Sequence, residues 1–106
     1  MTSRARPEVY EAIANPTRRR ILQLLDGRER RVTDLAARFT TTRSAISQHL
    51  GILREAGLVE DRREGRTRYY RTRPEPLGEV VDWLSYFDSF WNERLVALSR
   101  HLSESS

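Results

Sequence analysis

The chain has 106 residues, of which 38% are hydrophobic and 32% are charged, and this composition predicts a single globular domain spanning residues 1–106. It contains no cysteine, which excludes disulfides, thiolate metal sites and cysteine nucleophiles. No apolar run approaches the roughly 18 residues of a membrane span, and residues 1–10 lack the apolar segment of a secretory signal. We therefore expect a cytoplasmic protein without a membrane partner.

The charges are distributed unevenly along the chain. Residues 1–73 hold 17 Arg and 9 acidic residues, a net charge of +8, whereas residues 74–106 hold 2 Arg and 6 acidic residues, a net charge of −4. A basic body with an acidic C-terminal segment is typical of a protein that meets an anionic polymer with one part of its surface. Charge alone does not separate this interpretation from a protein whose charges are merely uneven.

Two short helices are predicted near the N-terminus. The first covers residues 8–14 and exposes three apolar residues on one side, namely Val9, Tyr10 and Ile13. Asn15 and Pro16 are typical of an N-cap and a first helical residue, and Gly27 is a plausible end for the second helix. The apolar side of that second helix consists of Ile21, Leu22, Leu24 and Leu25.

Residues 33–56 predict a helix-turn-helix. Thr33 is expected to cap a helix over residues 34–39, whose inward side consists of Leu35, Ala36 and Phe39. The three threonines at residues 40–42 break that helix, and Thr42 then caps a second helix over residues 43–56, which Gly57 ends. Two short helices joined by so short a turn form the helix-turn-helix motif.

The segment over residues 58–72 predicts a β-hairpin, or wing. Strand-forming residues flank a turn at Glu64 and Gly65. Four arginines lie near the tip of the hairpin, namely Arg62, Arg63, Arg66 and Arg68. The fold class predicted from these elements is mainly α with a small β-hairpin: a winged helix-turn-helix of αααα-ββ-α order.

A long helix is predicted after Pro74 and Pro76. Apolar residues recur there at spacings of three and four, at Leu77, Val80, Leu84, Phe87, Trp91, Leu95, Leu98 and Leu102. This stripe is more apolar surface than one thin domain can cover. We therefore expect a partner helix, most simply the same helix of a second copy of the chain.

The helix over residues 43–56 has two contrasting sides. Its apolar side consists of Ile46, Leu50 and Leu53, and its polar side of Ser44, Ser47, Gln48, Gly51 and Arg54. Gln can bond an adenine edge, Arg a guanine edge and Ser a base or phosphate, and Arg43 at the helix start suits a phosphate. A solvated amphipathic helix would show the same pattern alone, but the preceding turn and the following wing favour a DNA-recognition helix.

Four stretches resemble the ArsR/SmtB family of winged-helix bacterial repressors: NPTRRRILQLL, VTDLAARF, SAISQHLGILREAGLV and REGRTRYYR. The resemblance covers residues 8–73, and the stretch WLSYFDSFWNERLVALSRHL resembles the last helix of its metal-independent, SdpR-like branch. The resemblance implies a homodimeric repressor that binds double-stranded DNA and is not an enzyme. It also implies that residues 8–14 and 74–102 form the dimer interface, at Val9, Tyr10, Ile13, Leu77, Val80, Leu84, Phe87, Trp91, Leu95 and Leu98. The expected DNA contacts lie in the recognition helix, at Thr42, Arg43, Ser44, Ser47, Gln48, His49 and Arg54. Those in the wing are Arg62, Arg63, Arg66, Thr67 and Arg68.

The sequence departs from the family pattern in two respects. The Cys pair of metal-sensing members is missing, and the last helix offers Asp82, Asp88, Glu93 and a single His101, too few converging ligands for a metal. We therefore expect no metal and no cofactor. Gly51 stands where the family often has Lys or Arg, which removes an expected phosphate contact and lowers helix propensity by about 1 kcal/mol relative to Ala.

Three other interpretations were weighed against DNA binding. Catalysis by Ser47, His49 and Asp34 is disfavoured, because residues two apart on a helix point in different directions. An aromatic concentration over residues 83–91 suits packing better than a small-molecule inducer pocket at the dimer interface. A winged-helix protein-interaction module, such as an anti-repressor, stays open as the alternative to an autoregulatory repressor on an inverted repeat. The RRR run at residues 18–20 is expected to face solvent, with Arg18 near a phosphate.

Overall fold

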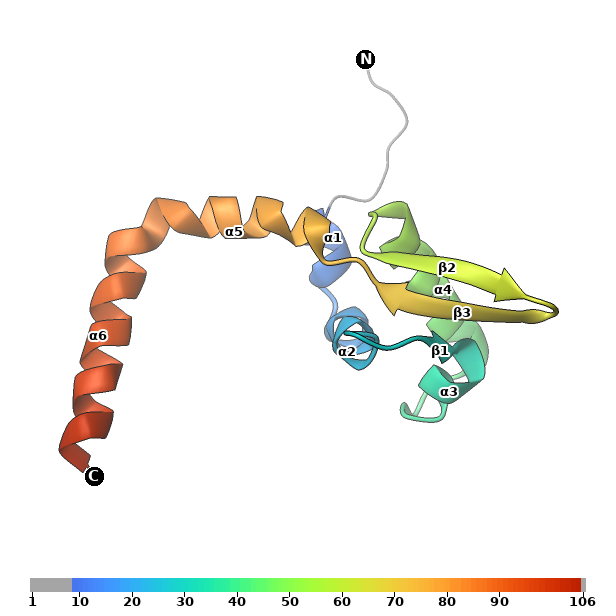
Figure 1. Ribbon diagram of the computed structural model, residues 1–106, viewed down its shortest axis with the longest axis horizontal. Coiled ribbons are helices and arrows are strands. Elements are labelled where there is room, and N and C mark those ends of the chain that lie inside the picture. The colour runs from blue at the N-terminus through green and yellow to red at the C-terminus, as the bar shows by residue number, and fades with distance from the viewer. Residues whose placement is uncertain (1–8, 106) are drawn as a thin grey trace, which may run out of the picture.

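The computed structural model describes residues 9–105 and shows a winged-helix body from which a helical arm extends (Figure 1). The body follows the order α1 (Val9–Ile13), α2 (Pro16–Leu24), β1 (Arg30–Arg31), α3 (Val32–Ala36), α4 (Arg43–Glu55), β2 (Val59–Glu64) and β3 (Thr67–Thr72). The arm consists of η1 (Glu75–Leu77), α5 (Gly78–Leu84), η2 (Ser85–Phe87) and α6 (Asp88–Ser105). The predicted fold class is confirmed. Glu8, the first residue of the predicted helix 8–14, lies outside the described residues.

The two best-defined helix starts are those that the sequence predicts. The side chain of Asn15 accepts a hydrogen bond from the Arg18 N–H at 3.1 Å, and Pro16 begins α2. The Thr42 hydroxyl accepts one from the Ala45 N–H at 3.0 Å and caps α4. Gly57 follows α4 with a φ of 81°, a left-handed conformation that favours glycine.

The predicted start of α3 is wrong by two residues. Its N-cap is Arg31, in an extended conformation with no side-chain cap bond, and Thr33 lies inside the helix. The strand β1 runs directly into α3, so the strand and not a capping hydroxyl sets the point where the helix begins. The helix ends at Ala36, which leaves Phe39 in the following turn, where it still packs against the core.

The wing belongs to a three-stranded antiparallel sheet of order β1-β3-β2. The hairpin register runs from Val59 opposite Thr72 to Glu64 opposite Thr67, and Gly65 turns the chain with a φ of 63°. The third strand, β1, pairs Arg30 with Tyr70 and was not predicted. Two consecutive arginines carry no strand signal, and this strand exists because β3 offers it a free edge.

The core lies between α1–α4 and the sheet. Its buried residues are Val9, Ala12, Ile21, Leu22, Leu25, Leu35, Ile46, Leu50, Leu53, Leu58, Val59 and Tyr70. Ile46, Leu50 and Leu53 face inward from α4, as their spacing predicts. Val9 corrects the sequence interpretation: it is buried in the core of its own chain and does not lie on the outer side of α1.

The C-terminal segment is not the single continuous helix that its periodicity predicts. The 3₁₀ turn η2 separates α5 from α6, and the two helices run in clearly different directions (Figure 1). The Ser85 hydroxyl donates a hydrogen bond to the Asp82 carbonyl at 2.6 Å, a local side-chain bond that competes with the helical backbone pattern. The bend therefore has a local cause.

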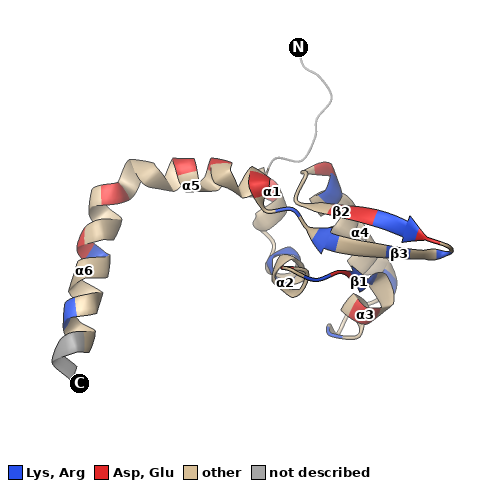
Figure 2. Cartoon of the chain, in the orientation of Figure 1, with Lys and Arg blue, Asp and Glu red and all other residues tan. Residues whose placement is uncertain are grey.

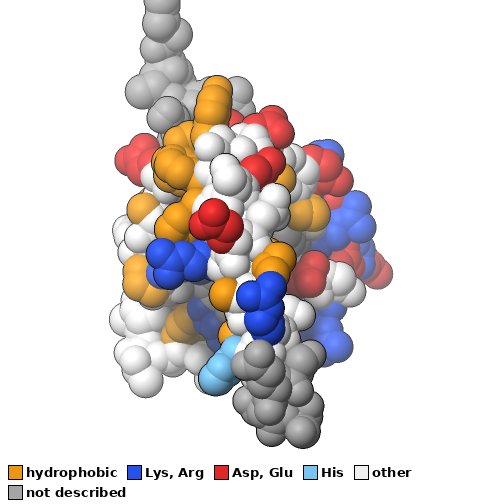
Figure 3. Space-filling view, turned by 90° about the vertical axis from the view of Figure 1, so that its left-hand side faces the viewer, with side chains coloured by type: hydrophobic (Ala, Val, Ile, Leu, Met, Phe, Trp, Pro, Cys, Tyr) orange, Lys and Arg blue, Asp and Glu red, His pale blue; other side chains and the backbone are white. Residues whose placement is uncertain are grey.

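The arm makes the molecule extended. Its radius of gyration is 17.6 Å, against about 13 Å for a compact chain of this length. Apart from Val80, the large apolar side chains of α5, η2 and α6 are exposed, from 38% for Leu84 to 83% for Tyr86. Patches of hydrophobic side chains are visible on the side where α6 lies (Figure 3). None of the helices in the described part of the chain has the length and hydropathy to cross a membrane.

Candidate nucleic-acid interface

The outward side of α4 is polar and nearly free of acid. Its buried residues face the core, while the opposite side exposes Thr42, Arg43, Ser44, Ser47, Gln48 and Arg54. The acidic residue of α4 is Glu55, at its last position, far from the helix start. A helix N-terminus carries free N–H groups and a partial positive charge, so this end of α4 favours an anion.

The start of α4 and the wing meet at a basic hollow. A cavity of about 250 Å³ is lined by Arg31, Val32, Thr33, Arg43, Arg66, Thr67 and Arg68. Four of these residues are arginines, and the lining contains no acidic side chain. The fold thus gathers arginines from β1, α4 and the wing, and the geometry suits a phosphate that carries the opposite charge.

Sequence reasoning missed three members of this hollow, Arg31, Val32 and Thr33. The sequence does contain a signal, because Arg30 and Arg31 form a basic pair directly before α3. Only the pairing of β1 with β3 brings this basic pair beside the wing, and that strand was not predicted. Arg31 also donates to Asp34 at 3.2 Å, and this hydrogen bond raises the pKa of Arg31 and lowers the pKa of Asp34.

Arg62 is engaged within the chain. Its guanidinium contacts Glu29 at 2.8 Å and Glu64 at 2.7 Å, and it lies 4.7 Å from the centre of the Tyr69 ring. The hydrogen bonds to Glu29 and Glu64 raise the pKa of Arg62, and the bond to Arg62 lowers the pKa of Glu29. The pair with Glu29 ties the wing to the loop before β1.

Two further predicted arginines share one carboxylate. Asp61 lies 3.0 Å from Arg68 and 3.6 Å from Arg54. A hydrogen bond to the Tyr70 hydroxyl, together with the charge of Asp61, raises the pKa of Arg68. Arg54 and Arg68 are therefore partly neutralised on the side of the wing that faces α4.

Three arginines of the predicted set keep an unneutralised charge. Within residues 9–105, no ion pair is recorded for Arg43, Arg63 or Arg66. Arg63 lies opposite Arg68 in the hairpin register, and like charges in that position repel each other. These three arginines place unpaired positive charge near the wing tip and at the start of α4, and Figure 2 shows blue segments on the wing interspersed with red ones.

His49 does not lie on the outward side of α4 with Gln48. It is half-buried against α2, and its Nδ1 lies 3.2 Å from the Arg18 guanidinium. Burial lowers the pKa of His49, and the nearby charge of Arg18 lowers it further. Arg18 also donates to the carbonyls of Ala12 and Glu11, at 2.7 and 3.2 Å, so its guanidinium is occupied by its own chain and does not face solvent as predicted.

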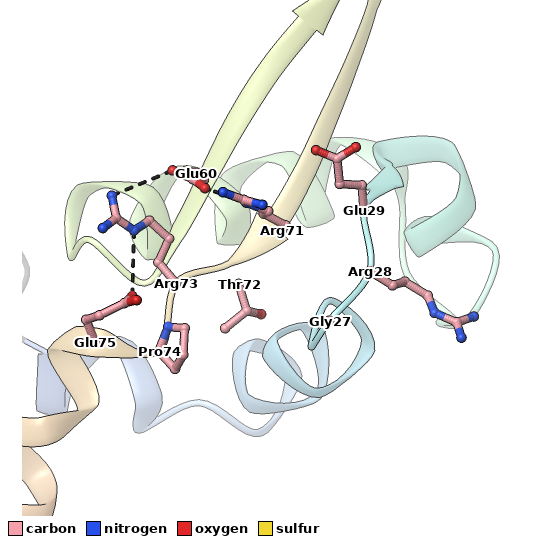
Figure 4. Close-up of a pocket in the computed structure, with 9 residues that line it drawn as sticks. All are labelled: Gly27, Arg28, Glu29, Glu60, Arg71, Thr72, Arg73, Pro74 and Glu75. Carbon is pink, nitrogen blue, oxygen red and sulfur yellow. Dashed lines mark hydrogen bonds and ion pairs between the residues drawn. The ribbon is translucent and has the colours of Figure 1, made fainter.

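A larger hollow on another part of the surface has mixed charge. This cavity of about 570 Å³ lies between the α2–β1 loop and the base of the wing. Glu60 pairs with Arg71 and Arg73, and Arg73 lies 3.7 Å from Glu75 at the start of the arm, as the dashed lines of Figure 4 show. Glu29, Glu60, Glu75, Arg71 and Arg73 of this hollow are all in ion pairs, so the hollow links the wing to the arm and favours an anion less than the basic hollow does.

The arm presents aromatic pairs to solvent. Trp83 lies 5.4 Å from Phe87 and 6.2 Å from Tyr10, and Phe90 lies 5.2 Å from Trp91, in each case ring centre to ring centre and edge to face. Of the predicted dimer contacts, Leu84, Phe87, Trp91, Leu95 and Leu98 are exposed. Ile13, Leu77 and Val80 are partly buried against the core of their own chain.

No metal site is evident in the arm or the body. Among residues 9–105, no three His, Cys, Asp or Glu side chains are gathered closely enough to hold an ion. Asp82, Asp88, Glu93 and His101, weighed above as possible ligands, are spread along the arm and do not converge.

The winged-helix fold, with the basic hollow between the start of α4 and the wing, defines a winged-helix DNA-binding protein. A family model described as "Bacterial regulatory protein, arsR family" matches residues 15–61. The transcriptional repressor SdpR of Bacillus subtilis is 38% identical over 79 residues, which cover 74% of this chain and 88% of that protein.

Solved structures agree with this assignment. The crystal structure of a possible transcriptional regulator for arsenical resistance is 53% identical and has a TM-score of 0.65, covering 82% of this chain and 91% of that chain. An ArsR-like transcriptional regulator from Rhodococcus sp. RHA1 is 33% identical, with a TM-score of 0.70 and coverage of 92% and 89%. The chain belongs to the ArsR family of bacterial regulatory proteins. It is a DNA-binding transcriptional regulator and not an enzyme.

Proposed function

We propose that the protein is a homodimeric, metal-independent repressor that binds an inverted-repeat operator in the bacterial cytoplasm, with residues 1–106 acting as one domain. The observation that carries this proposal is the basic hollow, whose lining holds Arg43 of α4 and Arg66 of the wing and no acidic side chain. A surface that meets the DNA backbone needs this arrangement, because phosphate contacts fix the register of a recognition helix.

Within this proposal, the exposed side of α4 enters the major groove. Gln48 and Ser47 are exposed one turn after the helix start, where the residues of a recognition helix meet base edges. Gln48 bonds an adenine edge, and Thr42, Ser44 and Ser47 supply hydroxyls to bases or phosphates. Arg54, at the far end of α4, approaches the DNA backbone, and its charge is partly neutralised by Asp61.

The wing then follows the neighbouring backbone. Arg63 and Arg66 carry unneutralised charge and make the main phosphate contacts, with Thr67 as a hydroxyl donor. Arg62 and Arg68 stiffen the hairpin through their ion pairs, and they contribute less to DNA affinity than their charge suggests.

The second copy of the chain covers the arm. The stripe of Leu84, Phe87, Trp91, Leu95 and Leu98 is exposed in one chain, and a contiguous exposed apolar surface marks an interface. A two-fold axis through paired arms presents two α4 helices to successive major grooves, which lie about 34 Å apart. Repression is steric, because polymerase is excluded from an occupied operator.

The test of this proposal is a binding assay on duplexes that the protein selects from a random pool. The dimer is expected to prefer a selected inverted repeat over random competitor by roughly 10³-fold or more. The logarithm of its affinity is expected to fall linearly with the logarithm of salt concentration. A chain that shows neither property is a protein-interaction module, and the proposal then fails.

The role of Gln48 is tested by Gln48→Ala on the selected duplex and on single-base variants of it. The expected result is a loss of preference at one base pair, worth about 1–3 kcal/mol, with little change in affinity for random duplex. Gln23→Ala is the matched control, because Gln23 is an exposed glutamine on α2, away from the recognition helix. A uniform loss on all duplexes would contradict base readout.

Metal independence is tested on the same duplex. Adding Zn²⁺ or Ni²⁺, or removing traces with EDTA, is expected to leave the dissociation constant unchanged. A metal-dependent release from DNA would contradict this part of the proposal and would leave the DNA-binding part intact.

A further inference from the structure

Arg18 connects three elements of the body. It lies in the first turn of α2, its Nε and Nη2 donate to the carbonyls of Ala12 and Glu11 at the end of α1, and its Nη1 lies 3.2 Å from Nδ1 of His49 on α4. A guanidinium has five donors in a fixed planar fork and no acceptor. It can therefore hold two carbonyls and an imidazole in one geometry, which a lysine cannot do.

The His49 ring has a defined state in this arrangement. Since Arg18 can only donate, Nδ1 must be the acceptor, and the proton of a neutral imidazole then lies on Nε2. Arg18 is the charged side chain recorded against this ring among residues 9–105. From α1 the neighbouring groups are the two backbone carbonyls that Arg18 itself binds.

The same contacts continue from α1 to the arm. The Tyr10 hydroxyl donates to the Glu79 carbonyl at 3.0 Å, and the Tyr10 ring lies 6.2 Å from that of Trp83 on α5. The end of α1 is therefore held between the arm on one side and Arg18 on the other. Tyr10, α1, Arg18 and His49 thus form a continuous series of contacts between α5 and α4.

We propose that Arg18 and His49 form a positioning pair that fixes the angle of the recognition helix relative to the arm, so that His49 acts on DNA affinity through Arg18 and not by touching DNA. This inference rests on the proposed function, because it takes α4 to be the helix that meets DNA. It assigns His49 a different role from the direct contact that the family resemblance implies.

Two substitutions of His49 separate positioning from direct contact. In His49→Asn, the amide oxygen occupies the place of Nδ1 and keeps the acceptor for Arg18, whereas the group at Nε2 is lost. His49→Ala removes both. On the selected duplex at neutral pH, His49→Asn is expected to stay within about twofold of the wild type, and His49→Ala and Arg18→Gln to bind on the order of tenfold more weakly. Equal losses in His49→Asn and His49→Ala would overturn the proposal.

The pH dependence gives a second test with a defined sign. Protonation of Nδ1 removes the acceptor and places two cations together, so the affinity of the wild type for the selected duplex is expected to fall as the pH drops from about 7.5 to about 5.5. His49→Asn is expected to lose this component. A direct imidazolium–phosphate contact would strengthen binding over the same range, and that result would overturn the proposal.

A double-mutant cycle and an NMR measurement complete the design. If the two residues act as a unit, Arg18→Gln combined with His49→Ala is expected to lose no more affinity than either change alone. Long-range ¹H–¹⁵N spectra of the wild type are expected to show the Nε2–H tautomer of His49, and the Nδ1–H tautomer would overturn the pair. Should Arg18→Gln fail to fold by circular dichroism, the His49 variants and the pH series decide the question.

The failure of this inference can be told from that of the proposed function. A wild type that selects no duplex and shows no salt dependence rejects the proposed function. A wild type that binds a selected duplex tightly, while Arg18→Gln and His49→Ala bind equally well, rejects only the positioning pair.

Discussion

The apolar residues of the body are largely buried, whereas those of the arm are largely exposed. In the body, seven large side chains are fully buried, and Leu53 is one of them. In α5, η2 and α6, the segments that form most of the arm, no residue of the described chain is buried, and Trp83, Trp91 and Leu95 are between 45% and 59% exposed. The body thus completes its own core, whereas the arm leaves its apolar residues exposed. In the proposed homodimer, fold stability and assembly are therefore carried by different parts of the sequence.

The largest expected effect is on the stability of the body. Leu53→Ala leaves a cavity among fully buried neighbours, so the free energy of unfolding is expected to fall by about 2–5 kcal/mol in urea titrations. Val96→Ala is the matched control, since Val96 is 54% exposed on the arm and its truncation is expected to cost less than about 0.5 kcal/mol. Similar losses of unfolding free energy for the two variants would contradict the difference in packing between the body and the arm.

The next effect concerns assembly. Leu98→Asp places a charge in the apolar stripe of α6 and is expected to convert the dimer into a folded monomer, as light scattering would show. Affinity for an inverted repeat is then expected to drop by about 100-fold, because each half-site is bound separately. Ala97→Asp adds the same charge on a different side of the helix and is expected to remain dimeric. A monomeric wild type at micromolar concentration would contradict the assignment of the arm.

A smaller effect distinguishes free from paired arginines in the wing. Arg66→Ala removes a charge that has no recorded ion pair in the described part of the chain, so it is expected to weaken all duplexes about fivefold and to make the salt slope shallower by about one. Arg62→Ala removes a charge already shared by Glu29 and Glu64 and is expected to change affinity less than about twofold. A larger loss of affinity for Arg62→Ala than for Arg66→Ala would show that DNA displaces Glu29 and Glu64 from Arg62.

The smallest expected effect is an increase in the free energy of unfolding. Gly51 lies inside α4, and a Cβ added there meets no heavy atom within 4 Å. Gly51→Ala is therefore expected to raise the free energy of unfolding by about 0.5–1 kcal/mol. Gly57→Ala is the opposite control, since Gly57 has a φ of 81° and the substitution is expected to destabilise the chain. A destabilised Gly51→Ala would show that α4 is strained there.

The elements that could be predicted from the sequence are those specified by local chemistry. The start and end of α4 follow from Thr42 and Gly57, its inward side from the spacing of Ile46 and its neighbours, and the hairpin from Gly65 and its strand formers. The winged-helix fold could be predicted because the caps, the periodicity and the turns all indicate the same structure in this part of the chain.

The elements that escaped prediction depend on contacts between distant residues. The strand β1 exists because Tyr69 and Tyr70 of β3 pair with it, and its formation moves the start of α3 away from Thr33. The pairing of Arg62 with Glu29 spans 33 positions, and that of Arg18 with His49 spans 31. From the sequence, these four side chains are seen only as charged groups or DNA contacts. In the fold, they hold separate elements together.

The free edges of the sheet bear on how the chain meets its copies. One edge is β1, which is two arginines long and turns at once into α3, and the other is β2, whose residues from Glu60 to Glu64 are all charged, three acidic and two basic. Short strands and charged side chains discourage the strand-to-strand addition that leads to aggregates. Pairing of one copy with another through the sheet is therefore disfavoured, and the β2 edge of the wing stays open to a ligand of a different chemical kind.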